Sequence, residues 1–180
     1  MKIVLLTPAH PLRGGIAASS ERLALEFQNL GHEVVLYSFS LQYPDFLFPG
    51  KTQRTTDPPP PGLQIRTLLN SVNPFNWIRV GWIIAQERPA YIVARFWLPF
   101  MGPCLGTVLR VARWVAHRKI RIVGLVDNLI PHEKRPGDRL FARYFTGACD
   151  EFVAMSRSVS AEIYQFCGKP ARFAPHPVYD

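Results

Sequence analysis

The chain has 180 residues, of which 48% are hydrophobic and 19% charged, a composition typical of one globular domain rather than a disordered segment. Its three cysteines are widely spaced and form no CxxC pair, which argues against a disulfide framework and a zinc site and fits a reducing cytoplasm. No apolar run reaches about 18 residues, which excludes a membrane-spanning helix, and the formal net charge of +8 indicates an anionic partner.

Strand-like and helix-like segments alternate along the whole chain. Short apolar runs rich in β-branched and aromatic residues predict strands at 2–7, 33–39, 63–69, 90–97, 120–126, 151–156 and 171–175. Segments with a helical spacing of apolar residues predict helices at 16–30, 73–89, 101–118, 138–148 and 158–166. The alternation predicts an α/β fold: a single Rossmann-like domain over residues 1–180, with a parallel sheet and helices on both of its faces.

The ends of several elements carry recognisable signals. Gly31 is placed as a C-terminal cap of the first helix, Asn73 as an N-cap directly before Pro74, and Ser156 as a cap of the last helix. Residues 39–62 predict a long loop, because the four consecutive prolines at 58–61 exclude a helix and a sheet ladder alike.

Two adjacent glycines, Gly14 and Gly15, stand between the first predicted strand and the first helix. The dinucleotide fingerprint G-x-G-x-x-G follows its strand directly, whereas here residues 8–14 intervene and no third glycine follows in place. NAD or FAD binding in the usual mode is therefore disfavoured, and no cofactor and no metal site are predicted. Two interpretations stay open: the N–H groups at the helix start bind an anion, or the glycines only permit a turn with positive φ.

Three segments together resemble the family 4 (group 1) glycosyltransferases of GT-B architecture. They are "GGIAASSERLALEFQNLGHEVVLYS", "DNLIPHEKRPGDRLFARYFTGACDEFVAMSRSV" and "FAPHPVYD". The resemblance implies a retaining, metal-independent transferase, of hexosyltransferase type, that moves a sugar from a nucleotide sugar to a glycan or lipid-linked acceptor. It further implies that this chain is the N-terminal, acceptor-side domain, that the C-terminal donor-binding domain is absent from it, and that it is inactive alone.

The resemblance places the Gly14–Gly15 turn at the interdomain cleft, near the diphosphate of the donor. Arg13, in the same loop, is a candidate partner for a phosphate, although a solvated arginine is an equal alternative. His10 lies in this loop as well and is counted among the candidate substrate-binding residues.

Asp127 and Asn128 end the fifth predicted strand, at the edge of the sheet where ligands bind in such folds. Many relatives have a histidine, oriented toward the donor sugar, where this chain has Asp127. A carboxylate there accepts a hydrogen bond from a sugar hydroxyl or acts as the base for an acceptor hydroxyl. The alternative is a turn aspartate that binds its own backbone. His132 and Glu133, farther along the same loop, are candidates for binding acceptor hydroxyls or for holding the loop in shape.

The charge excess lies in the middle of the chain, where residues 63–125 carry nine basic side chains and one acidic one. On the helix through 105–118, a rotation of about 100° per residue places four residues on one face: Arg110, Arg113, Trp114 and His117. The opposite face is apolar and predicted to pack on the sheet. The basic face fits the interface of an anionic membrane, or equally an ordinary solvated surface with Trp114 packed against a neighbour. The preceding helix is apolar nearly all round, so it is either fully buried or docked on a partner.

Three classes of function are therefore weighed. A cytoplasmic glycosyltransferase, peripheral at the inner face of the plasma membrane, is favoured because its motifs occur in order. A dinucleotide-binding oxidoreductase domain lacks the third glycine. A non-enzymatic basic module binding an anionic membrane or nucleic acid is supported by charge alone, and no nucleic-acid partner is expected because no RNA- or DNA-binding motif is present.

Overall fold

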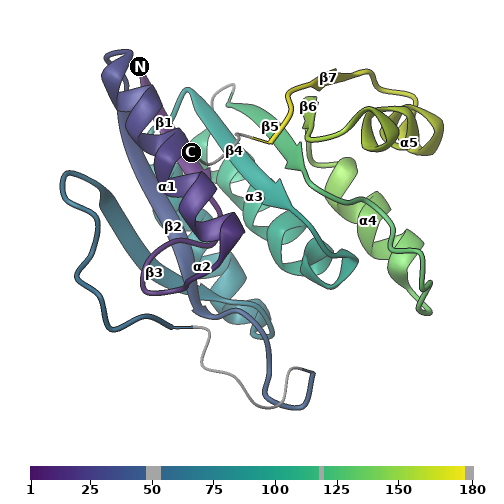
Figure 1. Ribbon diagram of the computed structural model, residues 1–180, viewed down its shortest axis with the longest axis horizontal. Coiled ribbons are helices and arrows are strands. Elements are labelled where there is room, and N and C mark those ends of the chain that lie inside the picture. The colour runs from purple at the N-terminus through teal and green to yellow at the C-terminus, as the bar shows by residue number, and fades with distance from the viewer. Residues whose placement is uncertain (48–53, 118–119, 177–180) are drawn as a thin grey trace.

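The computed structural model of the protein describes residues 1–47, 54–117 and 120–176. Within them, seven parallel strands form one sheet in the order β3-β2-β1-β4-β5-β6-β7 (Figure 1). The strands are β1 (Lys2–Leu6), β2 (Glu33–Leu41), β3 (Gln64–Asn70), β4 (Tyr91–Phe96), β5 (Arg121–Val126), β6 (Glu151–Ala154) and β7 (Ala171–Phe173). The helices are α1 (Gly15–Asn29), α2 (Pro74–Gln86), α3 (Gly102–Ala116), α4 (Asp138–Thr146) and α5 (Arg157–Cys167). The predicted Rossmann-like α/β fold is confirmed.

The predicted elements differ from the observed ones mainly at their ends. β2 continues to Leu41, beyond its predicted end, because shifts in register let it keep pairing with β3 as far as Asn70. The proline run at 58–61 contains no helix or strand, as predicted. Residues 48–53 of the predicted loop and residue 118 of the predicted third helix lie outside the described residues.

The predicted caps are confirmed. The Asn73 side chain accepts hydrogen bonds from the backbone N–H groups of Phe75 and Asn76, and Ser156 accepts one from Val159. Gly31 follows α1 with a φ of +86°, in the left-handed region. These local signals fix where the helices begin and end, and so where the loops at the sheet edge start.

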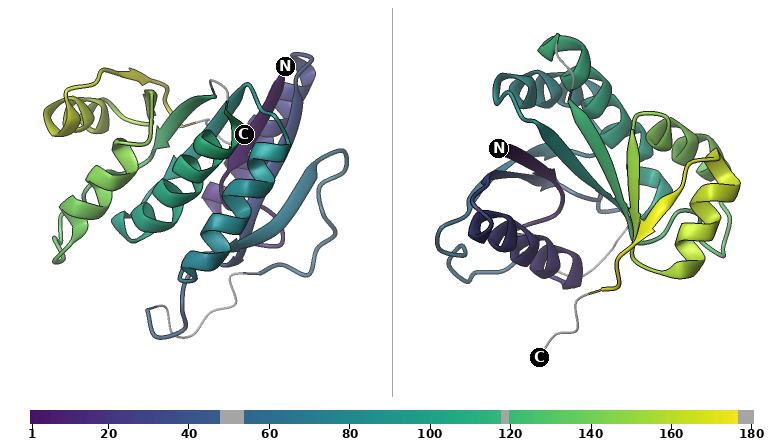
Figure 2. Two further views of the ribbon diagram at one scale, coloured as in Figure 1. Left: turned by 180° about the vertical axis from the view of Figure 1, so that it is seen from behind. Right: turned by 90° about the horizontal axis from the view of Figure 1, so that it is seen from above.

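The two faces of the sheet are covered unequally. α1 packs on one face over β1 and β2, where it closes a small apolar cluster that includes Leu5, Ala24 and Leu36. α2, α3 and α4 lie side by side on the opposite face (Figure 2), and α5 packs on β7 at the end of the sheet. The chain first builds β1, β2 and β3 outward in one direction and then crosses to β4 on the other side of β1. Ligands of such sheets bind beside that reversal, at the carboxyl ends of the strands.

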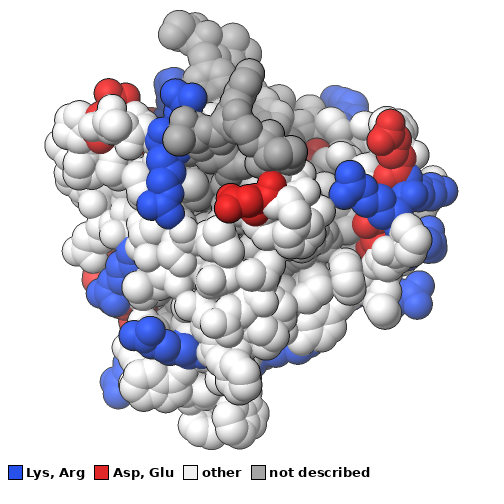
Figure 3. Space-filling view, turned by 90° about the horizontal axis from the view of Figure 1, so that it is seen from below, with Lys and Arg blue, Asp and Glu red and all other residues white. Residues whose placement is uncertain are grey.

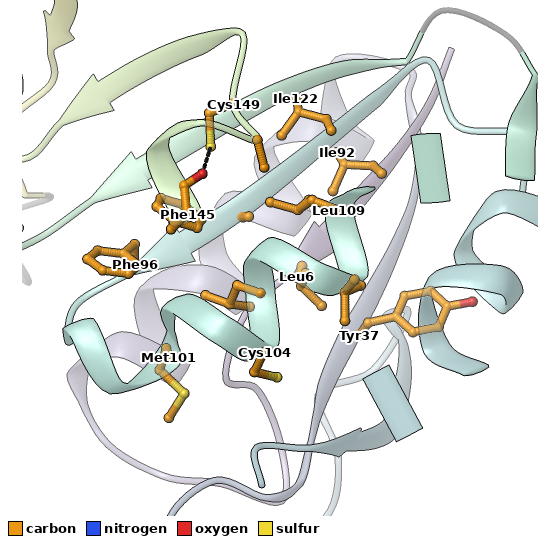
Figure 4. Close-up of a cluster of buried hydrophobic side chains, with 14 of the residues drawn as sticks. Leu6, Tyr37, Ile92, Phe96, Met101, Cys104, Leu109, Ile122, Phe145 and Cys149 are labelled. Atoms are coloured by element: carbon orange, nitrogen blue, oxygen red, sulfur yellow. Dashed lines mark hydrogen bonds between the residues drawn. The ribbon is translucent and has the colours of Figure 1, made fainter. Parts of the chain in front are cut away.

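The larger core lies between the sheet and α2, α3 and α4, and its centre is shown in Figure 4. Phe96 and Phe145 stack there with ring centroids 4.4 Å apart. Helices α2 and α3 meet at Gly81, where an added Cβ would lie 2.8 Å from the carbonyl oxygen of Val108. Cys104 and Cys149 are buried in the same core, and burial raises the pKa of both thiols. They are structural rather than reactive cysteines.

Glu87, the single acidic residue of the basic middle segment, is largely buried just after α2. Its carboxylate lies 2.5 Å from Lys2 Nζ and 2.8 Å from Arg66 Nη1, and it accepts a hydrogen bond from the Tyr37 hydroxyl at 2.9 Å. Burial alone would raise the pKa of Glu87, but the hydrogen bonds from Lys2 and Tyr37 and the charge of Arg66 outweigh it and hold that pKa below its ordinary value. Glu87 therefore ties α2 to β1, β2 and β3 in its ionised form.

Replacing this carboxylate tests how much the cluster stabilises the fold. We expect Glu87→Gln to lower the free energy of unfolding by about 1–3 kcal/mol at neutral pH. The matched control is Glu33→Gln, which removes a second Lys2 partner, 3.1 Å away, whose side chain is 60% exposed. Its effect is expected to be much smaller because solvated pairs contribute little.

The same cluster predicts a pH dependence. Because the folded-state pKa of Glu87 is lowered, the unfolded chain binds its proton first. The stabilisation is therefore complete above the unfolded pKa, about 4.3, and is lost as pH falls through the folded pKa. Between about pH 5 and pH 3, the free energy of unfolding measured in urea should fall more steeply for the parent protein than for Glu87→Gln. An equal fall of the unfolding free energy with pH in the two proteins would contradict this prediction.

Candidate functional site

The carboxyl ends of the strands form one edge of the molecule, seen face-on in Figure 3. Much of the middle of that face carries neither Lys and Arg nor Asp and Glu, and charged side chains gather toward its margins. The loops that follow β1 and β5 meet at this edge, and both were predicted to carry ligand-binding residues.

The loop between β1 and α1 is fastened from three sides. Ser38 Oγ accepts a hydrogen bond from the Ala9 N–H and donates one to the Ala9 carbonyl. The Glu21 carboxylate of α1 accepts from the His10 N–H at 2.6 Å. Leu12 and Arg54 form an antiparallel bridge. The loop therefore presents the glycine turn in a defined position.

The glycine turn opens α1. Gly14 has a φ of +125°, a conformation that favours glycine, and no side chain caps the helix start. Both glycines are exposed, as is Arg13 beside them. A hollow of about 220 Å³ lies between this turn and the segment from Thr55 to Pro60. The start of a helix attracts anions through its N–H groups and its dipole, so the arrangement is suited to a phosphate.

His10 has a structural role in this loop. Its Nε2 lies 2.9 Å from the backbone oxygen of Asp57, so the ring holds the segment that borders the glycine turn. The sequence analysis counted His10 among the candidate substrate-binding residues, and His10 does line the hollow beside the glycine turn.

Asp127, at the end of β5, is bound by an arginine that sequence analysis did not single out. The guanidinium of Arg95, from β4, donates to Asp127 through Nε and Nη2, both at 2.7 Å. Arg95 is 2% exposed and the Asp127 side chain 12% exposed. This is a bidentate, charge-assisted pair, the strongest geometry for arginine and carboxylate.

The third nitrogen of the same guanidinium reaches α1. Arg95 Nη1 donates to the Ile16 carbonyl at 3.2 Å, to Ser19 Oγ at 2.5 Å and to Ser20 Oγ at 3.0 Å. The Ser20 hydroxyl is also 2.7 Å from Thr7 Oγ1, at the end of β1. One buried side chain thus connects the first turns of α1 with the end of β5.

His176 reaches Asp127 from the far end of the described chain, with Nε2 3.2 Å from Asp127 Oδ1. A carboxylate has about four acceptor sites, so Arg95 and His176 leave one for a further donor. Asp127 thus lies at the meeting point of β4, β5 and the chain after β7.

A second hollow, of about 640 Å³, lies between the loop after β5 and helix α5. Asn128 and His132 line it, together with Lys134, Arg139, Glu162 and Phe166. Burial raises the pKa of Glu162, and the neighbouring His132 partly offsets this. Glu133 is exposed and does not line the hollow, so the structure separates the predicted pair. The volume and the polar lining suit a sugar-sized ligand.

The residues predicted to face a membrane lie away from this edge, on α3. Arg110 stacks over the Tyr144 ring at 3.9 Å, and Arg113 pairs with Asp150 at 2.6 Å. Trp114 is 75% exposed, and His117 ends the helix with a φ of +48°. Leu105, Val108 and Ala112 are buried on the opposite side of α3, as predicted.

Within the described part of the chain, no three His, Cys, Asp or Glu side chains gather as a metal site. In the same residues, no helix has the length and apolar character needed to cross a bilayer.

A Rossmann-like parallel sheet with a helix start and a fixed carboxylate at its carboxyl edge defines the class: one domain of GT-B type. The chain belongs to Glycosyltransferase Family 4, whose sequence model matches residues 13–178. This membership confirms the resemblance read from the glycine turn and the later segments. It also argues against the dinucleotide-binding oxidoreductase alternative, whose G-x-G-x-x-G motif lacks its third glycine in this chain.

Solved structures share the fold. An alpha-glucosyltransferase in complex with UDP and DNA matches with a TM-score of 0.64 and 12% identity, over 99% of this chain and 43% of that one. UDP-N-acetylglucosamine 2-epimerase from Rickettsia bellii matches with a TM-score of 0.59 and 12% identity, over 98% and 45%. The UDP-GlcNAc 2-epimerase from Methanocaldococcus jannaschii gives 0.58 and 8% identity, over 92% and 42%.

The chain spans less than half the length of these proteins. Identities this low show a shared fold alone. No curated protein sequence matches the chain.

The buried pair predicts a large stability effect. We expect Arg95→Met to lower the free energy of unfolding by about 3–5 kcal/mol, because it leaves the Asp127 carboxylate without its cation. The matched control is Arg121→Met, at the exposed pair with Glu151, where a far smaller change is expected. Urea denaturation of both variants measures the two changes in unfolding free energy. Equal decreases would show that the Arg95–Asp127 pair contributes no more to stability than the exposed pair.

Proposed function

We propose that the protein acts in a nucleotide-sugar-dependent glycosyltransferase, transferring a hexosyl group to a glycan or lipid-linked acceptor. In this proposal the chain supplies the acceptor side of the site and a helix start for the diphosphate of the donor. The observation that carries it is that, in a family 4 domain, the exposed glycine turn at the start of α1 and a fixed Asp127 lie at the same edge of the sheet. The reaction is placed in the cytoplasm, which the three unpaired cysteines favour.

The diphosphate subsite rests on the start of α1. The first turn of the helix holds no acidic residue, and Glu21, one turn farther on, is already engaged with the His10 N–H. Arg13 is exposed beside Gly14. The partial positive charge of the helix start stabilises the negative charge that develops on a departing nucleoside diphosphate.

The acceptor subsite rests on the 640 Å³ hollow beside Asp127. Asn128 and His132 line this hollow and offer hydrogen bonds to hydroxyl groups there. Asp127, the residue before Asn128, does not line the hollow, and in this proposal it accepts a hydrogen bond from the ligand at the edge of the sheet. Arg95 already binds both carboxylate oxygens of Asp127. We therefore propose that Asp127 orients a sugar hydroxyl, in preference to acting as a general base.

The orienting role predicts graded effects on turnover in the complete enzyme. Asp127→Ala is expected to lower kcat roughly 10²-fold or more, whereas Asp127→Asn, which keeps one acceptor oxygen, retains more of the activity. Asp45→Ala, outside the hollows described above, serves as the control. Initial rates with a radiolabelled nucleotide sugar measure this. An unchanged kcat for Asp127→Ala in a folded variant would limit Asp127 to a structural role as the partner of Arg95.

The chain alone is expected to transfer no sugar, because a GT-B reaction takes place between two domains. The measurement is turnover of a panel of nucleotide sugars against a blank without enzyme. Turnover by these 180 residues above the blank would defeat the assignment of the chain as an acceptor-side domain.

A further inference from the structure

Helix α2 presents an exposed apolar side that the site does not use. Phe75, Ile78 and Trp82 follow one another at helical spacings of three and four and are 84%, 52% and 52% exposed. The sequence left two alternatives for this helix, full burial or docking on a partner. Full burial is excluded, because one side of α2 packs on the core and the other is exposed. Protruding apolar side chains that share one side of a helix mark an interaction surface.

The apolar side continues onto α3 and α4. Gly81 of α2 packs closely against Val108 and Val111 of α3. Trp82, the next residue on α2, is 52% exposed, and Trp114, three residues after Val111 on α3, is 75% exposed. On α4, Leu140 is 68% exposed. The three helices lie next to one another in Figure 2. We name the exposed side of this helical layer, with Phe75, Ile78, Trp82, Trp114 and Leu140, the α2–α4 face.

The charge of the α2–α4 face is of one sign. The three helices carry five arginines: Arg79, Arg110, Arg113, Arg139 and Arg143. Their one acidic residue, Asp138, is 8% exposed and accepts a hydrogen bond from the Arg135 N–H. Arg113 is paired with Asp150, just beyond α4, and within the described residues the other four arginines form no ion pair. Two of them, Arg139 and Arg143, lie over the Phe166 ring of α5.

The α2–α4 face differs from the membrane-facing surface predicted from the sequence, which grouped Arg110, Arg113, Trp114 and His117 on one side of the third helix. Arg110 and Arg113 are directed toward α4, where they contact Tyr144 and Asp150. Trp114 is 75% exposed instead. The surface therefore spans three helices, and its exposed aromatic residues lie on α2 and α3.

We propose that the α2–α4 face docks on an anionic lipid bilayer. Indole and phenyl rings at a membrane interface insert among the headgroups, while arginine side chains extend along them to lipid phosphates. A second copy of this chain fits the face less well, because a twofold contact would set the same arginines against each other. Attraction by a few arginines gives reversible adsorption rather than firm anchoring.

The docking proposal does not rest on the proposed function, and the two surfaces share one residue, Arg139, which also lines the 640 Å³ hollow. The site residues lie at the carboxyl edge of the sheet, whereas Trp82 lies in the second half of α2 and Trp114 in the last turn of α3, away from the edge at which these helices begin. A failure of one proposal therefore leaves the other standing.

The test is co-sedimentation of the chain with vesicles of phosphatidylcholine that contain phosphatidylglycerol, and with pure phosphatidylcholine vesicles. We expect binding to the anionic vesicles only, and a loss of that binding as salt is raised, since charge is screened over about 8 Å at physiological ionic strength. Trp82→Ala combined with Trp114→Ala should lower the partition coefficient roughly tenfold or more. Leu30→Ala with Phe173→Ala, two exposed apolar residues elsewhere, is the matched control.

Charge and fluorescence give two further readouts. Arg79→Glu should weaken binding, whereas Arg22→Glu, an equal change on α1, should not. Trp77 and Trp97 already donate hydrogen bonds within the protein, so a blue shift of emission on binding should come from the two exposed indoles and vanish in their double variant. Equal binding to both kinds of vesicle, binding to neither, or binding that the double variant retains would each overturn the proposal.

Discussion

The buried ion pair of Arg95 and Asp127 is the interaction on which the candidate site depends. A guanidinium is costly to remove from water unless its donors are satisfied, and here all three nitrogens have partners. Two of them hold Asp127 at the end of β5, and the third holds the Ser19 and Ser20 hydroxyls of α1. The glycine turn and the carboxylate thus occupy fixed positions relative to each other, although they come from opposite sides of the strand reversal.

The unequal covering of the sheet separates two kinds of surface. On one side α1 stands alone and leaves a mainly apolar hollow of about 310 Å³ beside Val93, Leu125 and Val153. On the other side a continuous layer of helices buries the larger core and turns aromatic and basic side chains outward. The carboxyl edge joins the two, so a ligand bound there contacts loops that are anchored in both layers.

Sequence patterns predicted the alternation of elements because doubly buried strands and capped helices leave local marks, such as the apolar run of β1 and the Asn73 cap. They also placed Gly14 and Asp127 at one edge, which follows from parallel strand order. Arg95 was missed because its partners lie 32 or more positions away in the chain. A charged residue inside the apolar strand from Tyr91 to Phe96 was the available signal.

Other parts of the site depend on packing that the sequence does not display. His176 meets Asp127 only because the chain returns past β7, and Glu162 joins the loop of His132 only because α5 packs beside it. Similarly, helical spacing grouped Arg110 and Arg113 with Trp114, but it does not show that α4 covers part of that side. The direction in which α2 turns its aromatic residues was undetermined for the same reason.

The two buried thiols give the molecule an internal reporter. Cys104 and Cys149 lie in the core between the sheet and the helical layer, and their raised pKa keeps them protonated and shielded from alkylating reagents. Their modification requires that this layer open, so the rate of thiol alkylation in the native state follows the opening equilibrium of the helical side. The two cysteines thus report on local opening of the helical layer without the introduction of a further residue.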